Sequence, residues 1–259
     1  MSGSNDFYVG YLPQAPDRLG RWLRRVVPVL LVLVAVLAVV LATRQDRFGP
    51  GVFEFGVERE FTGVVLELPY PTLFVLHPAG SAAAIAHEPL LLVAWGKHGA
   101  AGFVQGMHGR PVRIQGTLLH RDGRAMIEVH TVEPLPPEEA AGLIVPVRGG
   151  IDRGEITLTG EVVDSKCYLG GMKPGHTKPH RGCAVRCISG GVPPLLLVVE
   201  PDGSTRRLVL ASAQGEMINA EVLPFVSELV EISGTVRVYG DLEVLHADPS
   251  SYRRVSTGG

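Results

Sequence analysis

A chain of 259 residues, of which 46% are hydrophobic, is long enough for two small domains that each bury a core. Its formal net charge of -2 gives neither the basic excess typical of nucleic-acid binding nor the acidic excess of a solvating tail. The 32 glycines and 20 prolines, with few aromatic residues, favour many short strands joined by turns over a helical bundle.

The first apolar segment, residues 26–43, carries no charge and approaches the length that crosses a bilayer. We predict a transmembrane helix at residues 26–44. A cleavable signal peptide is the alternative, but both the polar region before the apolar run and the run itself are longer than such a signal needs. More arginines precede the helix than follow it, namely Arg18, Arg21, Arg24 and Arg25 against Arg44 and Arg47.

This arginine bias sets the expected orientation, because positively charged flanks stay on the cytoplasmic side of a membrane. We therefore expect residues 1–25 to be cytoplasmic. The predicted location is the bacterial inner membrane, with the bulk of the chain periplasmic or otherwise extracytoplasmic.

The rest of the sequence repeats itself. The segment FTGVVL at residues 61–66 is echoed by LTGEVV at 158–163, and VRIQGT at 112–117 is echoed by VEISGT at 230–235. Two matched segments in the same order indicate a tandem repeat of one domain.

Each copy can be divided into five strands, the number found in the OB-fold, a small Greek-key barrel. A glycine late in the first and fourth strands would mark the bends at which such a barrel closes. We also predict a short amphipathic helix at residues 213–225, between the third and fourth strands of the second copy. The predicted fold class is mainly β, with two tandem OB-like five-stranded barrels after one N-terminal transmembrane helix. The predicted boundaries are a linker at 45–60, the first barrel at 61–133, a linker at 134–154, the second barrel at 155–250 and a tail at 251–259.

The second copy carries an insertion. Gly63 and Gly116 of the first copy are 53 residues apart, whereas Gly160 and Gly234 of the second are 74 apart. The 21 additional residues belong between the first two strands, in a loop at residues 165–194. OB-folds use this loop to bind ligands, and long structured loops in compact domains are usually functional.

The insertion holds all three cysteines of the chain. If residues 180–187 are helical, His180, Cys183 and Cys187 share one face of the helix, and Cys167 closes the cluster from the end of the preceding strand. Three thiols and one imidazole can complete the coordination of Zn(II), or bind a soft ion such as Cu(I). We predict that these four residues are the ligands of a zinc or copper ion.

Four nearby residues are expected to support this site. Lys166 and Arg181 would favour the thiolate forms of the cysteines. Asp164 is expected to end the first strand in an Asx turn, with a hydrogen bond to His180 as the alternative. His176 is the second histidine of the insertion and is included as a supporting residue.

Two other interpretations of the cysteines remain open. Outside the cytoplasm a disulfide from Cys167 to Cys183 or Cys187 would pin the inserted helix to the first strand and leave one thiol unpaired. Thiol-disulfide exchange is the third interpretation, weakened by the absence of a Cys-x-x-Cys motif. The first copy has none of these residues, and its scattered histidines are expected to be solvated: His77, His87, His98 and His108.

The insertion and its flanks form a motif of specific spacing. It has G-x-V-V-D-x-x-C at residues 160–167, then H-x-x-C-A-x-x-C at 180–187 and G-x-P at 191–193. This motif resembles one in small bacterial exported proteins, which have G-x-V-x-D-x-x-C and then H-x-x-C-A-x-x-C-x-x-x-G-x-P. The resemblance implies an extracytoplasmic domain in which the acidic, thiol and imidazole groups act together, and it implies no particular reaction.

Together these features predict a membrane-anchored extracytoplasmic binding or accessory protein that holds a metal ion for a redox or metal-handling membrane complex. The expected partners are the membrane and a protein of that complex. Nucleic acid is not expected, because no face combining aromatic and basic residues stands out. A non-enzymatic role is favoured; the alternatives are an interaction subunit clamped by a disulfide and a thiol-disulfide oxidoreductase.

Overall fold

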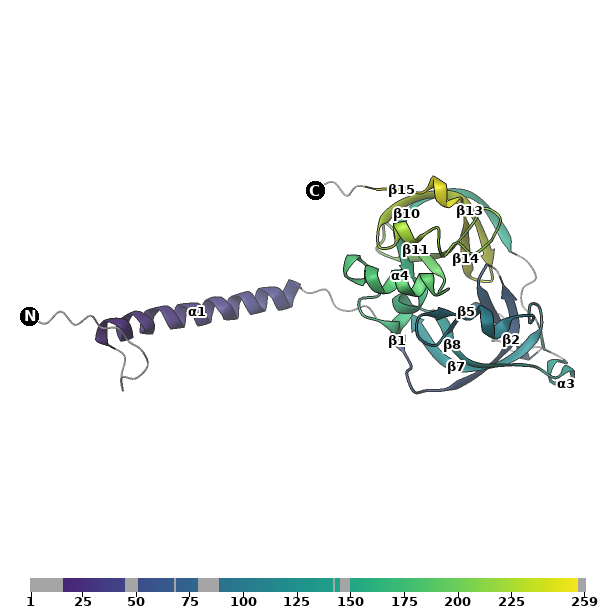
Figure 1. Ribbon diagram of the computed structural model, residues 1–259, viewed down its shortest axis with the longest axis horizontal. Helices are drawn as coiled ribbons and strands as arrows, with labels where there is room; N and C mark the ends of the chain where they lie inside the picture. The colour runs from purple at the N-terminus through teal and green to yellow at the C-terminus, as the bar shows by residue number, and fades with distance from the viewer. Residues whose placement is uncertain are drawn as a thin grey trace, which may run out of the picture. The chain divides into compact units, whose positions relative to one another are not determined.

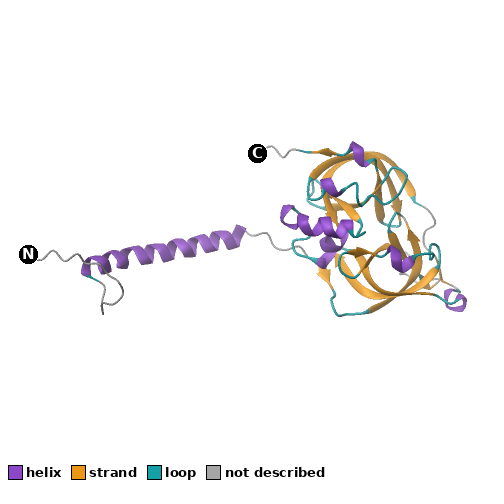
Figure 2. Cartoon of the chain, viewed as in Figure 1, coloured by secondary structure: helices purple, strands orange, loops and turns teal. Residues whose placement is uncertain are grey.

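The computed structural model describes residues 16–44, 51–67, 69–78, 89–141, 143–144 and 150–255. The chain forms two compact units, Met1–Arg47 and Phe48–Gly259. The first contains the long helix α1 (Asp17–Arg44), and the second contains the strands of both barrels (Figures 1 and 2).

Helix α1 is long and apolar enough to cross a membrane. It begins at Asp17, ahead of the predicted span, because the arginine-rich residues before the apolar run are also helical. Asp17 lies in the first turn, where a carboxylate is favoured by the partial positive charge of a helix N-terminus. None of the residues of α1 is buried, which distinguishes it from the core helix of a globular domain.

The first barrel is closed by five strands. Around the barrel β2 pairs with β3, β3 with β5, β5 with β8, β8 with β7, and β7 again with β2. The β5–β8 pair is parallel and the others are antiparallel, the order of an OB-like barrel. The strands are β2 (Arg59–Glu67), β3 (Pro71–Val75), β5 (Pro89–Ala94), β7 (Pro111–Arg121) and β8 (Arg124–Pro134).

Shorter elements surround this barrel. A strand within the predicted linker, β1 (Val52–Phe53), extends the sheet beside β7, and β2 itself begins two residues earlier than expected. The other short elements are β4 (His77–Pro78), β6 (His98–Gly99), α2 (Ala101–Val104), α3 (Pro137–Ala140) and β9 (Leu143–Ile144).

The second barrel repeats the same order of strands. Its first strand pairs with the second and fourth, its third and fifth strands are parallel, and the fourth and fifth are antiparallel. The prediction of two tandem OB-like barrels is therefore confirmed. The strands are β10 (Ile151–Asp164), β11 (Pro194–Val199), β12 (Thr205–Ala211), β13 (Leu229–Tyr239) and β14 (Leu242–His246), with β15 (Arg253–Arg254) added beside β13.

The repeated glycines lie where neighbouring strands approach most closely. A β-carbon on Gly63 would lie 2.6 Å from the carbonyl oxygen of Phe74, and one on Gly160 would lie 2.6 Å from that of Leu197. Only glycine permits so close an approach, so these residues mark equivalent bends in the two barrels.

The prediction of an amphipathic helix at residues 213–225 is wrong. The structure has turns there and a single 3-10 turn, Leu223–Phe225. Gly215 has a φ of +87°, which interrupts a right-handed helix, and the side-chain amide of Asn219 donates to carbonyl oxygens of the insertion. Ile218 is buried as its apolar character indicates, but it is buried by a loop.

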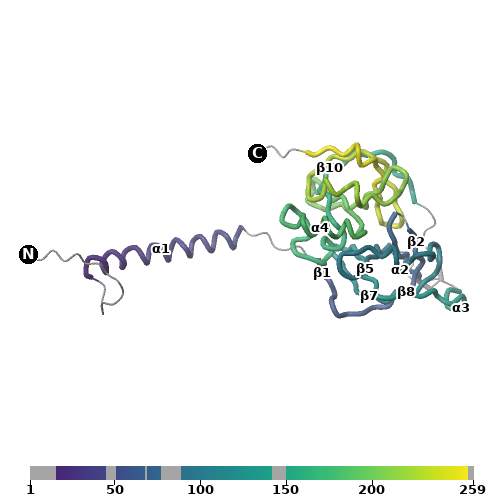
Figure 3. The backbone as a smooth tube through the Cα atoms, in the orientation of Figure 1, coloured from purple at the N-terminus to yellow at the C-terminus, as the bar shows by residue number. Residues whose placement is uncertain are grey.

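The two barrels share a hydrophobic core in addition to the core inside each one. This shared core joins residues of the first barrel, such as Phe74 and Met126, to residues of the second, such as Val209. Cys167 and Cys187 belong to it, so the inserted cysteines lie at the boundary of the barrels rather than at a distant loop tip. Figure 3 shows the insertion, in green, next to the strands of the first barrel.

Candidate metal centre

The insertion leaves β10 at Asp164 and returns to β11 at Pro194, and these two residues are paired across the strands. It contains a short helical turn, Cys167–Gly171, then a 3-10 turn, Lys178–His180, and then helix α4 (Arg181–Ser189). The expectation that residues 180–187 are helical is correct except that His180 is the residue just before α4.

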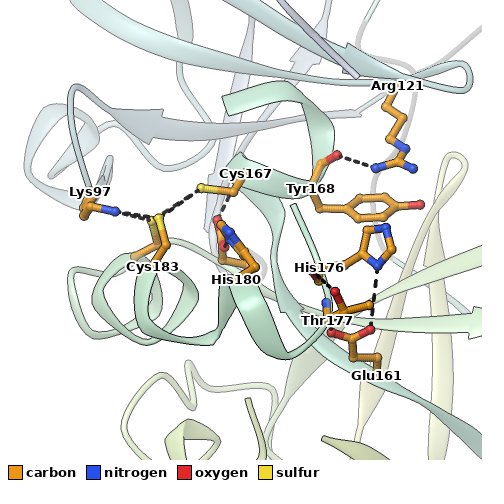
Figure 4. Close-up of polar contacts among 11 residues, drawn as sticks. Lys97, Arg121, Glu161, Cys167, Tyr168, His176, Thr177, His180 and Cys183 are labelled. Carbon is orange, nitrogen blue, oxygen red and sulfur yellow. Dashed lines mark hydrogen bonds and ion pairs between the residues drawn. The ribbon is translucent and has the colours of Figure 1, made fainter. Parts of the chain in front are cut away.

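The three thiols meet between the helical turn and α4. The Sγ of Cys167 lies 3.7 Å from the Sγ of Cys183 and 3.9 Å from that of Cys187. Figure 4 shows Cys167 and Cys183 facing each other. All three cysteines are free, and these distances are well beyond the S–S bond length of about 2.05 Å, so the structure does not show the alternative disulfide.

His180 and Asp164 form a buried pair next to the thiols. Nε2 of His180 lies 2.9 Å from Oδ2 of Asp164, and the other carboxylate oxygen accepts a hydrogen bond from the backbone N–H of Cys167 at 2.8 Å. Asp164 therefore turns the chain and also orients the imidazole, so the preference for a turn alone is corrected. Because Nε2 faces Asp164, Nδ1 is the ring nitrogen left to bind a metal.

The predicted ligands gather in two overlapping groups. Ligand atoms of Cys167, His180 and Cys183 lie within 4.8 Å of one another, and so do those of Asp164, Cys167 and Cys187. Cys167 is common to both groups. The structure thus forms a Cys/His cluster close to metal-binding geometry, although not as one set of four ligands.

The first barrel contributes a residue that the sequence did not indicate. Nζ of Lys97 lies 2.6 Å from Sγ of Cys183 and 3.9 Å from Sγ of Cys187 (Figure 4). This hydrogen bond raises the pKa of Lys97. The pKa of Cys187 is lowered, chiefly because Cys167 donates a hydrogen bond to it, and the pKa of Cys167 is raised for the same reason and by burial. The ammonium group of Lys97, 3.9 Å from Cys187, therefore faces the thiol on which negative charge is favoured.

Lys166, in the insertion of the second barrel, contacts residues of the first barrel. Its ammonium group donates to the carbonyl oxygens of Ala94 at 2.8 Å and Gly96 at 2.6 Å, and it forms an ion pair with Glu128. The side chains of Lys166 and Glu128 are only 6% and 5% exposed. The structure thus corrects the predicted role of Lys166, because its charge is paired with Glu128 and it fixes the turn that carries Lys97.

The other two supporting residues lie away from the thiols. Arg181 is half exposed and faces Glu228, with Nη1 and Oε1 3.8 Å apart. The ring of His176 packs edge-on against Tyr168, and its Nδ1 lies 4.0 Å from Oε2 of Glu161 (Figure 4). Burial lowers the pKa of His176 and raises that of Glu161. These contacts assign Arg181 and His176 to other parts of the surface.

The histidines of the first copy join no further group of metal-ligand side chains in the part of the chain that the structure describes. Nδ1 of His108 accepts a hydrogen bond from the backbone N–H of Glu67 at 3.2 Å. His98 lies in β6, while His87 and the side chain of His77 are outside the described residues.

A pocket of about 260 Å³ opens beside the thiols. Its inner wall contains the three cysteines, Lys97 and the Lys166–Glu128 pair, and apolar side chains form its rim. Since Cys183 is only partly buried, the cluster can be reached through this pocket.

The chain matches no family model and no curated protein. Among solved structures it is similar to the single-stranded DNA-binding protein from Thermus aquaticus. The wild-type protein is 11% identical with a TM-score of 0.21, covering 81% of this chain and 95% of that chain. A deletion mutant of the same protein is 10% identical with a TM-score of 0.22, covering 81% of this chain and 97% of that chain.

The end of α4 packs tightly against the turn that carries Lys97. The backbone N–H of Gly99 donates to the carbonyl oxygen of Gly190 at 2.9 Å. A β-carbon on Gly190 would overlap the carbonyl oxygen of Lys97, whereas one on Gly182, in the first turn of α4, would meet nothing within 4 Å. These two glycines therefore test the packing of the same helix at its two ends.

We expect Gly190→Ala to push the Lys97 turn away from α4. The cost should resemble that of overpacking a core, about 1–3 kcal/mol in the free energy of unfolding. Gly182→Ala should leave stability unchanged or raise it by up to about 1 kcal/mol, because alanine favours a helix. Denaturant unfolding of the two variants measures both effects, and equal stabilities would contradict the close packing.

Proposed function

We propose that this is a membrane-anchored binding or accessory protein whose Cys/His cluster holds a zinc or copper ion for a redox or metal-handling complex of the bacterial inner membrane. The spacing of the sulfur atoms carries the proposal. In a tetrahedral site with metal–sulfur bonds of about 2.3 Å, sulfur ligands lie about 3.8 Å apart. Here the Sγ of Cys167 lies 3.7 Å from that of Cys183 and 3.9 Å from that of Cys187.

The surrounding groups suit a bound cation. Cys167, Cys183 and Cys187 would supply thiolates and His180 an imidazole, with Asp164 holding the ring in the carboxylate–histidine arrangement common around metals. Three thiolates around a divalent ion leave one negative charge, which the ammonium group of Lys97 offsets. A bound ion would cross-link the insertion or, if it is copper, carry an electron.

Helix α1 supports the membrane part of the proposal. It has the length and apolar character of a membrane span, and the arginines before its apolar run favour a cytoplasmic N-terminus. The barrels would then lie on the extracytoplasmic side. A non-enzymatic role is part of the proposal, because the thiols and the imidazole gather around Cys167 as metal-ligand groups.

Metal analysis of the full-length protein, purified anaerobically in detergent, tests the site. We expect about one equivalent of zinc or copper per chain, and loss of most of that metal in Cys183→Ser, because a tetrahedral site that loses a thiolate retains three ligands. Thiol titration after chelation should find all three cysteines reduced.

Histidine variants provide a matched control. His180→Asn should lower the metal content, whereas His130→Asn should not, because His130 forms only an exposed pair with Glu58 in the first barrel. Absence of metal together with a single titratable thiol would reject ligation and support the disulfide-clamped interaction subunit. Absence of metal with a disulfide that exchanges readily would instead support the oxidoreductase.

A further inference from the structure

The rim of the thiol pocket is unusually apolar and exposed. Phe55 and Trp95 are 80% and 75% exposed, the highest values for large apolar side chains in the described part of the barrels. Both line the pocket, together with Phe53 and the 46%-exposed Met172. We call Phe53, Phe55, Trp95 and Met172 the aromatic rim.

The aromatic rim is held in place by the fold. Phe53 belongs to β1, which pairs with β7, and its ring packs edge-on against Phe55 with the centroids 5.6 Å apart. Trp95 begins the turn to which Lys166 donates a hydrogen bond, at the carbonyl oxygen of Gly96. Exposed apolar side chains that are held together in this way are typical of a surface that docks on a partner.

The position of the aromatic rim in the sequence favours the lipid surface as the partner. Only six residues separate Arg44, the last residue of α1, from Gly51. An extended chain between them spans at most about 25 Å, and one from Arg44 to Phe55 at most about 40 Å. If α1 spans a bilayer, part of the aromatic rim is tethered close to the membrane surface, where tryptophan and other aromatic side chains are favoured at the level of the lipid headgroups.

We infer that the aromatic rim docks on the lipid surface, so that the thiol pocket opens toward the membrane. This inference rests on the membrane anchor proposed above but not on the bound metal. A partner that exchanges a metal ion or an electron with the cluster would then have to reach the site along the membrane.

Trp95 can report on this contact directly, because the chain has only two tryptophans. The full-length Trp22→Phe variant leaves Trp95 as the single indole. In proteoliposomes made with lipids brominated near the headgroup, we expect its emission to be quenched and shifted to shorter wavelength relative to the same protein in detergent.

A matched probe elsewhere on the barrels tests whether the contact is specific. Val199 is 71% exposed and lies in the second barrel, outside the thiol pocket. Tryptophan placed there in the variant Trp22→Phe, Trp95→Phe, Val199→Trp should be quenched far less than Trp95. Equal quenching at both positions would mean unspecific contact and would overturn the inference.

Flotation separates this inference from the proposed function. If the protein does not float with the liposomes, both the anchor and the docking are rejected. If it floats but Trp95 is not quenched, the docking alone is rejected and the aromatic rim is left to a protein partner. Metal content measured on the same samples reports on the cluster independently of either result.

Discussion

Replacing Asp164 with alanine is expected to weaken metal binding by roughly 10- to 100-fold, the effect of removing a carboxylate that orients a metal-binding histidine. Asp164 is fully buried, and its two oxygens hold the imidazole of His180 and the backbone N–H of Cys167. Without the carboxylate, the imidazole of His180 and the backbone N–H of Cys167 lose the hydrogen-bond acceptor that fixes their orientation next to the sulfur atoms. The measurement is a competition titration with a chelator of known affinity.

The same replacement should lower stability even without a metal. It leaves two buried donors without an acceptor, at a cost of about 1–3 kcal/mol each. Asp202→Ala is the matched control, since Asp202 also accepts a backbone N–H, from Ser204, but in an exposed turn. The control should lose little stability and no metal affinity. If both variants bound metal as the wild type does, Asp164 would have no role in the site.

The fold could be predicted where a single residue type, such as glycine, is required at a given position. The four repeated glycines are required by the close approach of neighbouring strands, so their spacing located both barrels and the insertion. The helix of the insertion was also predictable. The i, i+3, i+7 spacing of His180, Cys183 and Cys187 indicates one face of a helix and depends on no contact with distant residues. Residues 213–225 show the limit of this reasoning, since apolar spacing there reflects burial by a loop around Gly215.

The part of the site that could not be predicted depends on contact between the barrels. Lys97 lies 86 residues before Cys183, and nothing in its local sequence links it to the insertion. Its only hint is the neighbouring Trp95, a large aromatic residue in a turn that is otherwise polar. Lys166 was misassigned for the same reason, because its partner Glu128 belongs to the other barrel. The first barrel is therefore part of the candidate site and not only a support for it.

Replacing Lys166 with methionine is expected to lower the free energy of unfolding by about 3–5 kcal/mol, because it leaves the carboxylate of Glu128 buried without its partner. The loss also frees the carbonyl oxygens of Ala94 and Gly96, so the turn that carries Lys97 should move. Denaturant unfolding measures the stability, and a changed alkylation rate of Cys183 would report that its contact with Lys97 is lost.

The double variant Lys166→Met, Glu128→Gln separates charge from packing. With both charges removed, no unpaired ion is buried, and the double variant should be more stable than the sum of the two single changes predicts by about 0.5–3 kcal/mol. The partly exposed pair of Arg206 and Glu243, 2.7 Å apart within the second barrel, is the control, and Arg206→Met should cost about 1 kcal/mol or less. If Lys166→Met cost no more than Arg206→Met, the ion pair of Lys166 and Glu128 would not hold the boundary between the barrels, and the position of Lys97 beside the thiols would not depend on it.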